Sequence, residues 1–200
     1  GVSALGVGAH IAGDLITSYG TMVLAPFSTI RPGLSVTFII DLWFSGIIVA
    51  GLAAGALWRA SATPARAALA LLAGYVCGQV LLQQQAVKVG ERFARDSGLQ
   101  GWTVSAQARP VSPFNWMVVV TDGEERRYAL VSLWRTDVPP APGPDAGLFE
   151  RFGAAYWPAD RAPWQVASIN GLDPADRALA REAWQHPGLR VFRWFAEHPV

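Results

Sequence analysis

His10 and Asp14 stand four residues apart in an otherwise apolar N-terminal stretch, GVSALGVGAHIAGDLITSYG. On a helix this spacing stacks both side chains on one face. A neutral imidazole nitrogen and a carboxylate oxygen are ordinary ligands of zinc and similar divalent ions, and a bound cation would offset the carboxylate charge. The same spacing also permits a hydrogen-bonded pair that lines a helix bundle. The pair therefore indicates either half of a metal site or a polar contact between helices.

Asp41 is a third ionisable residue in apolar surroundings, inside the run LSVTFIIDLWFSGIIVAGLAAGALW. A central aspartate in a membrane helix costs about 2.5 to 3.5 kcal/mol on insertion scales, so its presence calls for a reason. We take Asp41 as a candidate third metal ligand. Two structural alternatives are that Asp41 begins a helix or pairs with Arg31.

The elements that must position these residues are predicted to be membrane helices. Among 16 Lys and Arg and 15 Asp and Glu residues, only Asp14, Arg31, Asp41, Arg59 and Arg66 fall within residues 1–87. The run 34–58 is long enough to span a bilayer, which takes roughly 20 residues. A second apolar run, 67–82, predicts a helix that leaves the membrane near Gln83 and continues in water to about Ser97. We expect the two to form a transmembrane helical hairpin, packed through small residues at helical spacing, namely Gly51, Gly55, Gly74 and Gly78.

Charge and cysteine content narrow the function classes. A net charge of +1 and the lack of any Lys- or Arg-rich run give no reason to expect nucleic acid as a partner. The one cysteine, Cys77, excludes an internal disulfide and a cysteine-based zinc site. The positive-inside rule favours a cytoplasmic location for the C-terminal part. The reason is that the open end of the predicted hairpin is flanked by Arg31, Lys88, Arg92 and Arg95.

Beyond residue 100 the pattern changes to that of a small soluble α+β domain. Two β-rich runs flank Asp122 and Gly123, a dipeptide suited to a hairpin turn. The Pro- and Gly-rich segment 138–147 predicts an exposed loop. Asp173 and Pro174 are typical of a helix start. We therefore divide the chain into a membrane helical region, residues 1–97, and a soluble α+β domain, residues 98–200.

The stretch HIAGDLITSYGTMVLAPFSTIRPGLSVTFIIDLWF resembles the signature of a family of bacterial inner-membrane proteins, the YdjM-like predicted metal-dependent hydrolases. In that family an H-x-x-x-D-x-x-x-x-Y-G segment leads into a P-F-S element, a basic residue and I-I-D-P. Leu42 replaces the proline after the aspartate, which removes no ligand. Further along, ARPVSPFNWMVVV and VFRWFAEHP resemble elements that open and close the family's soluble part.

The resemblance implies a multi-pass inner-membrane hydrolase with a divalent metal ion, zinc being the expected one. Members usually begin with a further segment that bears an acidic residue and a histidine, so the chain resembles a fragment without it. A more distant likeness to helical zinc-dependent phospholipases C and nucleases implies His10 and Asp14 as ligands and a phosphoester substrate. Tyr19 and Ser28 are candidates for orienting a ligand or a water, and the alternative for Tyr19 is a helix-end tyrosine at the membrane interface.

Two functions follow as hypotheses. The first is a membrane-bound hydrolase that acts on an ester or phosphoester of a small molecule or lipid through a metal-activated water. The second is a non-enzymatic, membrane-anchored binding or scaffold protein, in which the polar pair only stabilises the helices.

Overall fold

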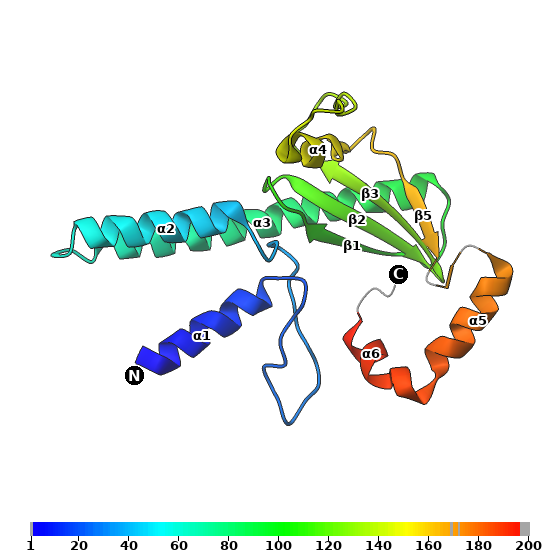
Figure 1. Ribbon diagram of the computed structural model, residues 1–200, viewed down its shortest axis with the longest axis horizontal. Coiled ribbons are helices and arrows are strands. Elements are labelled where there is room, and N and C mark those ends of the chain that lie inside the picture. Colours follow the sequence, from blue (N-terminus) through cyan, green and yellow to red (C-terminus); the bar gives the residue numbers. More distant parts are fainter. Residues whose placement is uncertain (1, 169, 172, 197–200) are drawn as a thin grey trace.

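The computed structural model describes residues 2–168, 170–171 and 173–196. The N-terminal half is helical, as the apolar runs predict. Helix α1 spans Val2–Leu15, α2 spans Leu42–Leu57, and α3 spans Thr63–Asp96. A long connection without helix or strand joins α1 to α2 and extends to one side of the molecule (Figure 1).

Helices α2 and α3 lie side by side as an antiparallel hairpin that projects from the rest of the protein (Figure 1). Gly51 is required at the contact, because a Cβ atom there would lie 2.4 Å from the Cβ of Ala68. A Cβ at Gly55, Gly74 or Gly78 would meet no atom within 4 Å. The prediction of a helical hairpin is thus confirmed, while close packing through small residues is confirmed only for Gly51.

The expectation of two membrane spans is not met. The first predicted span, 34–58, is helical only from Leu42, which leaves 16 residues and about 24 Å against a hydrocarbon core of about 30 Å. Among the described residues, α3 alone is long and apolar enough to cross a membrane. Within the part of the chain that the structure describes, one candidate span is supported and a multi-pass arrangement is not.

The first span is shortened because residues 34–37 turn back onto the end of α1. The backbone N–H of Leu34 donates to Leu15 O at 2.8 Å, and that of Val36 donates to Ile16 O at 3.0 Å. From α3, Gln83 Nε2 donates to Leu34 O at 2.8 Å and to Ala106 O at 3.1 Å. These contacts fix an extended segment that cannot also be helical.

The C-terminal half is built on a five-stranded sheet. Strands β1 (Thr103–Ala108), β2 (Asn115–Asp122) and β3 (Glu125–Ser132) form an antiparallel meander. On the free edge of β3, β4 (Trp157–Pro158) pairs in parallel with one end and β5 (Gln165–Ser168) antiparallel with the other. Asp122 pairs with Glu125, so the predicted hairpin is confirmed, but its two-residue loop is Gly123 and Glu124 rather than Asp122 and Gly123, with Gly123 at φ 60°.

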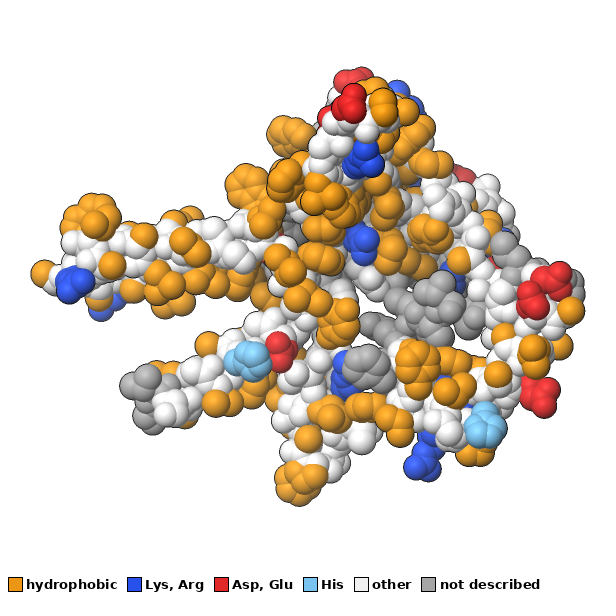
Figure 2. Space-filling view, viewed as in Figure 1, with side chains coloured by type: hydrophobic (Ala, Val, Ile, Leu, Met, Phe, Trp, Pro, Cys, Tyr) orange, Lys and Arg blue, Asp and Glu red, His pale blue; other side chains and the backbone are white. Residues whose placement is uncertain are grey.

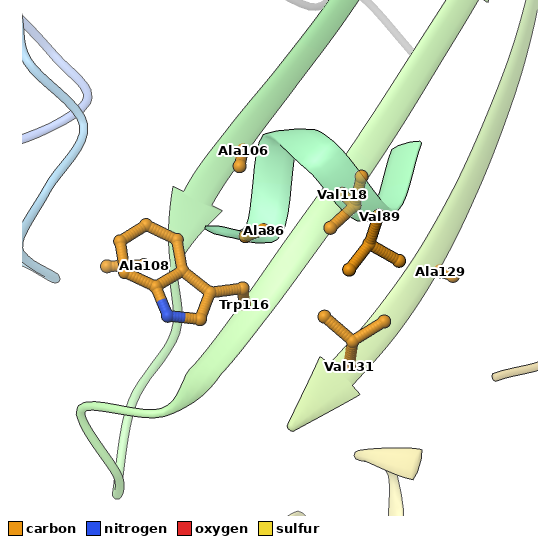
Figure 3. Packing of buried hydrophobic residues seen from close by; sticks show 8 residues of the cluster. All are labelled: Ala86, Val89, Ala106, Ala108, Trp116, Val118, Ala129 and Val131. Atoms are coloured by element: carbon orange, nitrogen blue, oxygen red, sulfur yellow. The ribbon is translucent and has the colours of Figure 1, made fainter. Parts of the chain in front are cut away.

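The C-terminal half of α3 covers this sheet and supplies part of its core. Ala86 and Val89 of α3 pack against alternate residues of the three meander strands (Figure 3). The alternation arises because side chains at every second position of a strand point to the same face. The core members are Ala86, Val89, Ala106, Ala108, Trp116, Val118, Ala129 and Val131.

Three further helices follow the meander: α4 (Leu148–Ala154), α5 (Pro174–Gln185) and α6 (Arg190–Phe195), with a 3-10 turn at Pro187–Leu189. The predicted start of α5 is confirmed, since Asp173 Oδ1 accepts from Ala175 N at 2.7 Å. Arg181 on α5 donates through Nε to Glu124 at 3.0 Å, and this bond lowers the pKa of the Glu124 carboxyl. The predicted loop 138–147 has no helix or strand.

The fold is therefore a helical part with one candidate span, followed by an α+β part around a mainly antiparallel sheet. The division at residues 97 and 98 stays a prediction, although the sheet shares its core with α3. The final residues of the VFRWFAEHP element, 197–199, lie outside the described residues.

Candidate functional site

His10 and Asp14 meet on one face of α1, as their spacing predicts. The His10 Nε2 atom lies 3.7 Å from Asp14 Oδ2, and the side chains are 80% and 45% exposed. The hydroxyl of Thr21 donates to the same Asp14 oxygen at 3.3 Å. Asp14 also ends the helix, because its carbonyl accepts from the backbone N–H and the hydroxyl of Thr17 at 3.1 and 2.8 Å. The pair thus sits at the C-terminal end of α1, where the chain enters the long connection.

The distance between these two atoms suits a shared metal ion. Zinc bonds to nitrogen and oxygen at about 2.0 to 2.2 Å, which puts two tetrahedral ligands about 3.3 Å apart. A small side-chain rotation of His10 or Asp14 would close the observed 3.7 Å to that value. However, the described residues contain no group of three or more His, Cys, Asp or Glu side chains placed to hold a metal ion. The pair therefore fits half of a metal site.

Asp41 does not join this pair in one metal-binding group among the described residues. Its Oδ1 accepts the backbone N–H groups of Trp43 and Phe44, both at 2.9 Å. Its Oδ2 accepts the Tyr75 hydroxyl of α3 at 2.7 Å. Asp41 is the N-cap of α2, which is the helix-start alternative raised from the sequence. Its assignment as a metal ligand stays a prediction, and both of its oxygens already have donors.

The other residues singled out near the pair have local partners. Ser28 Oγ accepts the backbone N–H of Ile30 at 3.2 Å, and so shapes the turn in which it lies. The Arg31 guanidinium donates to the backbone carbonyl of Tyr19 and lies 5.4 Å from the ring centre of Trp194. The Tyr19 side chain is exposed, so its expected role in orienting a ligand or water stays a prediction.

The sequence patterns did not indicate Thr21 and Tyr75, two residues whose side chains contact the candidate ligands. Thr21 lies seven residues after Asp14, too far for a contact on one helix. The predicted hairpin could have indicated the contact between Tyr75 and Asp41. An antiparallel pair of helices with a turn near residues 58–62 brings the start of α2 opposite the middle of α3, where Tyr75 is a hydroxyl group in an apolar run.

Comparison with known proteins supports the resemblance for the first part of the chain. Residues 1–86 match the family model described as YdjM inner membrane protein. This range contains α1, the long connection, α2 and most of the apolar half of α3. No curated protein and no solved structure matches the chain significantly. Residues 1–86, which hold the His10 and Asp14 pair, are therefore similar to the family described as YdjM inner membrane protein.

Proposed function

We propose that the protein is a membrane-anchored, metal-dependent hydrolase in which His10 and Asp14 are two ligands of a divalent metal ion, with zinc the expected one. The observation that carries the proposal is the 3.7 Å separation of His10 Nε2 and Asp14 Oδ2 on an exposed helix face. Further ligands would come from outside the described residues, which hold no third candidate beside the pair.

The chemistry follows from the donor set. His10 would bind as a neutral imidazole, and Asp14 as a carboxylate that the Thr21 hydroxyl helps to orient. When bound, a divalent cation lowers the pKa of a coordinated water and polarises an ester or phosphoester. A small molecule or a lipid is the expected substrate class, because the pair lies in a part of the chain matched to an inner-membrane family.

We further propose that the α2–α3 hairpin enters the inner membrane with the sheet on the cytoplasmic side. Hydrophobic side chains cover the visible face of the hairpin, and basic side chains gather at its outer end (Figure 2). The opposite end carries Lys88, Arg92 and Arg95 on the α3 segment that leads to the sheet. An excess of basic residues favours the cytoplasmic side.

A second candidate function is a membrane-anchored binding or scaffold protein. The observation that favours it is the lack of a third ligand beside the pair among the described residues. In that case the His10 and Asp14 contact would serve only to hold the end of α1 near the connection.

Metal analysis of the protein purified in detergent tests the proposal. We expect near-stoichiometric zinc or manganese, and loss of that metal in His10→Ala and in Asp14→Ala. A metal-loaded sample should hydrolyse a chromogenic phosphodiester or ester, and chelation should abolish this activity. Metal content that neither substitution changes would contradict the assignment of the pair.

Two control variants sharpen the result. His186→Ala removes a histidine far from α1, one whose Nδ1 only accepts from Gly188 N at 3.2 Å, and should leave the metal content unchanged. Asp41→Asn keeps a good N-cap and should also retain the metal, because both carboxylate oxygens are engaged elsewhere. Bound metal without hydrolysis of any ester would favour the binding protein.

A further inference from the structure

A second exposed apolar surface, apart from the hairpin, surrounds α4. It consists of Trp134, two residues after β3, and of Leu148, Phe149 and Phe152 on α4, and we call these four residues the α4 patch. The Trp134 side chain is 76% exposed and that of Phe149 is 67% exposed. Exposed apolar patches of large side chains are typical of surfaces that contact another protein or a membrane.

The α4 patch is held in place on the sheet. Arg135 Nη1 donates to Gly153 O at 3.0 Å and to Tyr156 O at 2.9 Å, which ties the end of α4 to the segment after β3. The Trp134 ring lies 5.3 Å from the ring of Phe114, which precedes β2. In addition β4, which follows α4, pairs with the last residues of β3. The patch therefore has a fixed position at the end of the sheet where β3 finishes.

The same end of the sheet faces the hairpin. On α3, Gln83 Nε2 donates to Ala106 O near the finish of β1. Further along the helix, Gly90 lies against Val104 and Val120, nearer the opposite end of the sheet. The apolar half of α3 therefore leaves the sheet at the end where β1 and β3 finish and β2 begins. Figure 1 shows α4 at this end, beside the base of the hairpin.

A lipid surface is the partner that fits this place. With the hairpin inserted, the end of the sheet from which it projects faces the headgroups. Hydrophobic side chains gather around α4 on the side from which the hairpin projects (Figure 2). Tryptophan and other aromatic side chains favour the membrane interface, where an apolar ring and a polar edge are both accommodated. The charges of α4 cancel, since Glu150 is acidic and Arg151 basic, so apolar burial rather than attraction to anionic lipid would hold it there.

We propose that the α4 patch is a second membrane contact, at which Trp134, Leu148 and Phe149 enter the interface of the leaflet that the hairpin crosses first. This inference rests on the proposed insertion of the hairpin and is independent of the metal site. Interfacial aromatic anchors help to set the tilt and rotation of a membrane helix. Two contacts, rather than the hairpin alone, then hold the sheet in one orientation on the membrane surface.

A nitroxide spin label at residue 149 tests this contact, with the full chain reconstituted in phosphatidylcholine liposomes. The label is attached to Phe149→Cys in a Cys77→Ser background. Power-saturation electron paramagnetic resonance then compares its collisions with oxygen, which concentrates in lipid, and with a water-soluble nickel chelate. We expect an oxygen-to-nickel collision ratio severalfold higher than at the control position, residue 179. Leu148→Cys, labelled in the same way, should repeat the result.

Leu179→Cys is the matched control, because Leu179 is also a 67% exposed apolar residue on a helix. Its helix, α5, lies at the opposite end of the sheet, where Arg181 donates to Glu124 of the hairpin turn. A label at residue 179 should therefore collide freely with the nickel chelate. Equal ratios at residues 149 and 179 would overturn the proposal.

A label on the native Cys77 separates this proposal from that of hairpin insertion. A lipid signal at Cys77 together with a water signal at residue 149 would overturn the α4 contact and leave the hairpin in the bilayer. A water signal at both positions would overturn both proposals. Few collisions with either reagent at residue 149 would also overturn the α4 contact, because the patch would then be covered by protein, such as a second copy of the chain.

Discussion

At the residue scale, two aspartates in apolar surroundings have opposite environments. Asp14 lies at a helix end, 45% exposed, and its side chain accepts one long hydrogen bond from Thr21. Asp41 accepts three hydrogen bonds, two from the backbone of α2 and one from Tyr75. Asp14 therefore keeps the capacity to bind a cation, while Asp41 ties the start of α2 to α3.

Replacing Asp41 should show this structural role. Asp41→Ala loses an N-cap, worth about 1 kcal/mol, and leaves the Tyr75 hydroxyl without its acceptor, worth about 1 to 3 kcal/mol. We expect the free energy of unfolding in detergent to fall by about 2 kcal/mol or more. In Asp41→Asn the free energy of unfolding should fall much less, because asparagine caps a helix equally well. Denaturant titration followed by circular dichroism measures both, and equal losses in the two variants would contradict the capping role.

At the element scale, α3 has two surroundings along one continuous helix. Its first half pairs with α2 and is apolar, whereas its second half packs on β1 and β2. Gly90 marks the closest approach to the sheet. A Cβ there would lie 2.6 Å from Val104 Cγ1, 2.8 Å from Val118 Cγ1 and 3.3 Å from Val120 Cγ2.

Alanine substitutions in the two halves of α3 should have opposite effects on stability. Gly90→Ala gains helix propensity of about 1 kcal/mol but overpacks the contact with the valines, at a cost of about 1 to 3 kcal/mol. We expect a net loss of stability. Gly74→Ala is the matched control in the same helix, where a Cβ meets no atom within 4 Å, and it should stabilise the protein. Melting temperatures of the two variants test this, and a Gly90→Ala variant as stable as Gly74→Ala would show that the helix does not approach the sheet so closely.

At the scale of the whole molecule, the protein is a sheet whose core includes residues of α3, and an apolar hairpin projects from it (Figure 1). Large hydrophobic side chains of the hairpin are exposed, among them Trp43, Leu52 and Leu69. Such a continuous apolar surface needs a cover. With the inner-membrane family match over residues 1–86, the lipid bilayer is the partner that fits this surface.

Cys77 is a natural probe of that arrangement, because it is the one cysteine and it is exposed on the apolar half of α3. It lies about 21 Å along the helix from Thr63, well inside a hydrocarbon core of about 30 Å. In freeze-thawed membrane vesicles, a charged maleimide should not label Cys77, whereas a lipid-soluble maleimide should.

The control for this experiment moves the thiol to the C-terminal half of α3. Arg92→Cys in a Cys77→Ser background should react with the charged maleimide, because residue 92 is exposed beside the sheet. Labelling of Cys77 at the rate of this control would show that the hairpin is not in the bilayer. Mass spectrometry of the intact protein reads out both reactions.

The sequence by itself determined the features that depend on near neighbours in the chain. The pairing of His10 with Asp14 follows from helical periodicity, the long helix Thr63–Asp96 from an unbroken run, and the start of α5 from Asp173. The meander strands follow from β-rich runs around a glycine turn. Only the tertiary structure decided where α2 begins, because residues 34–37 bond to the end of α1 rather than extending the helix. It also decided that Asp41 meets Tyr75 and that Arg135 ties α4 to the end of β3. These contacts join residues far apart in the chain, and no local pattern of residue types fixes such distances.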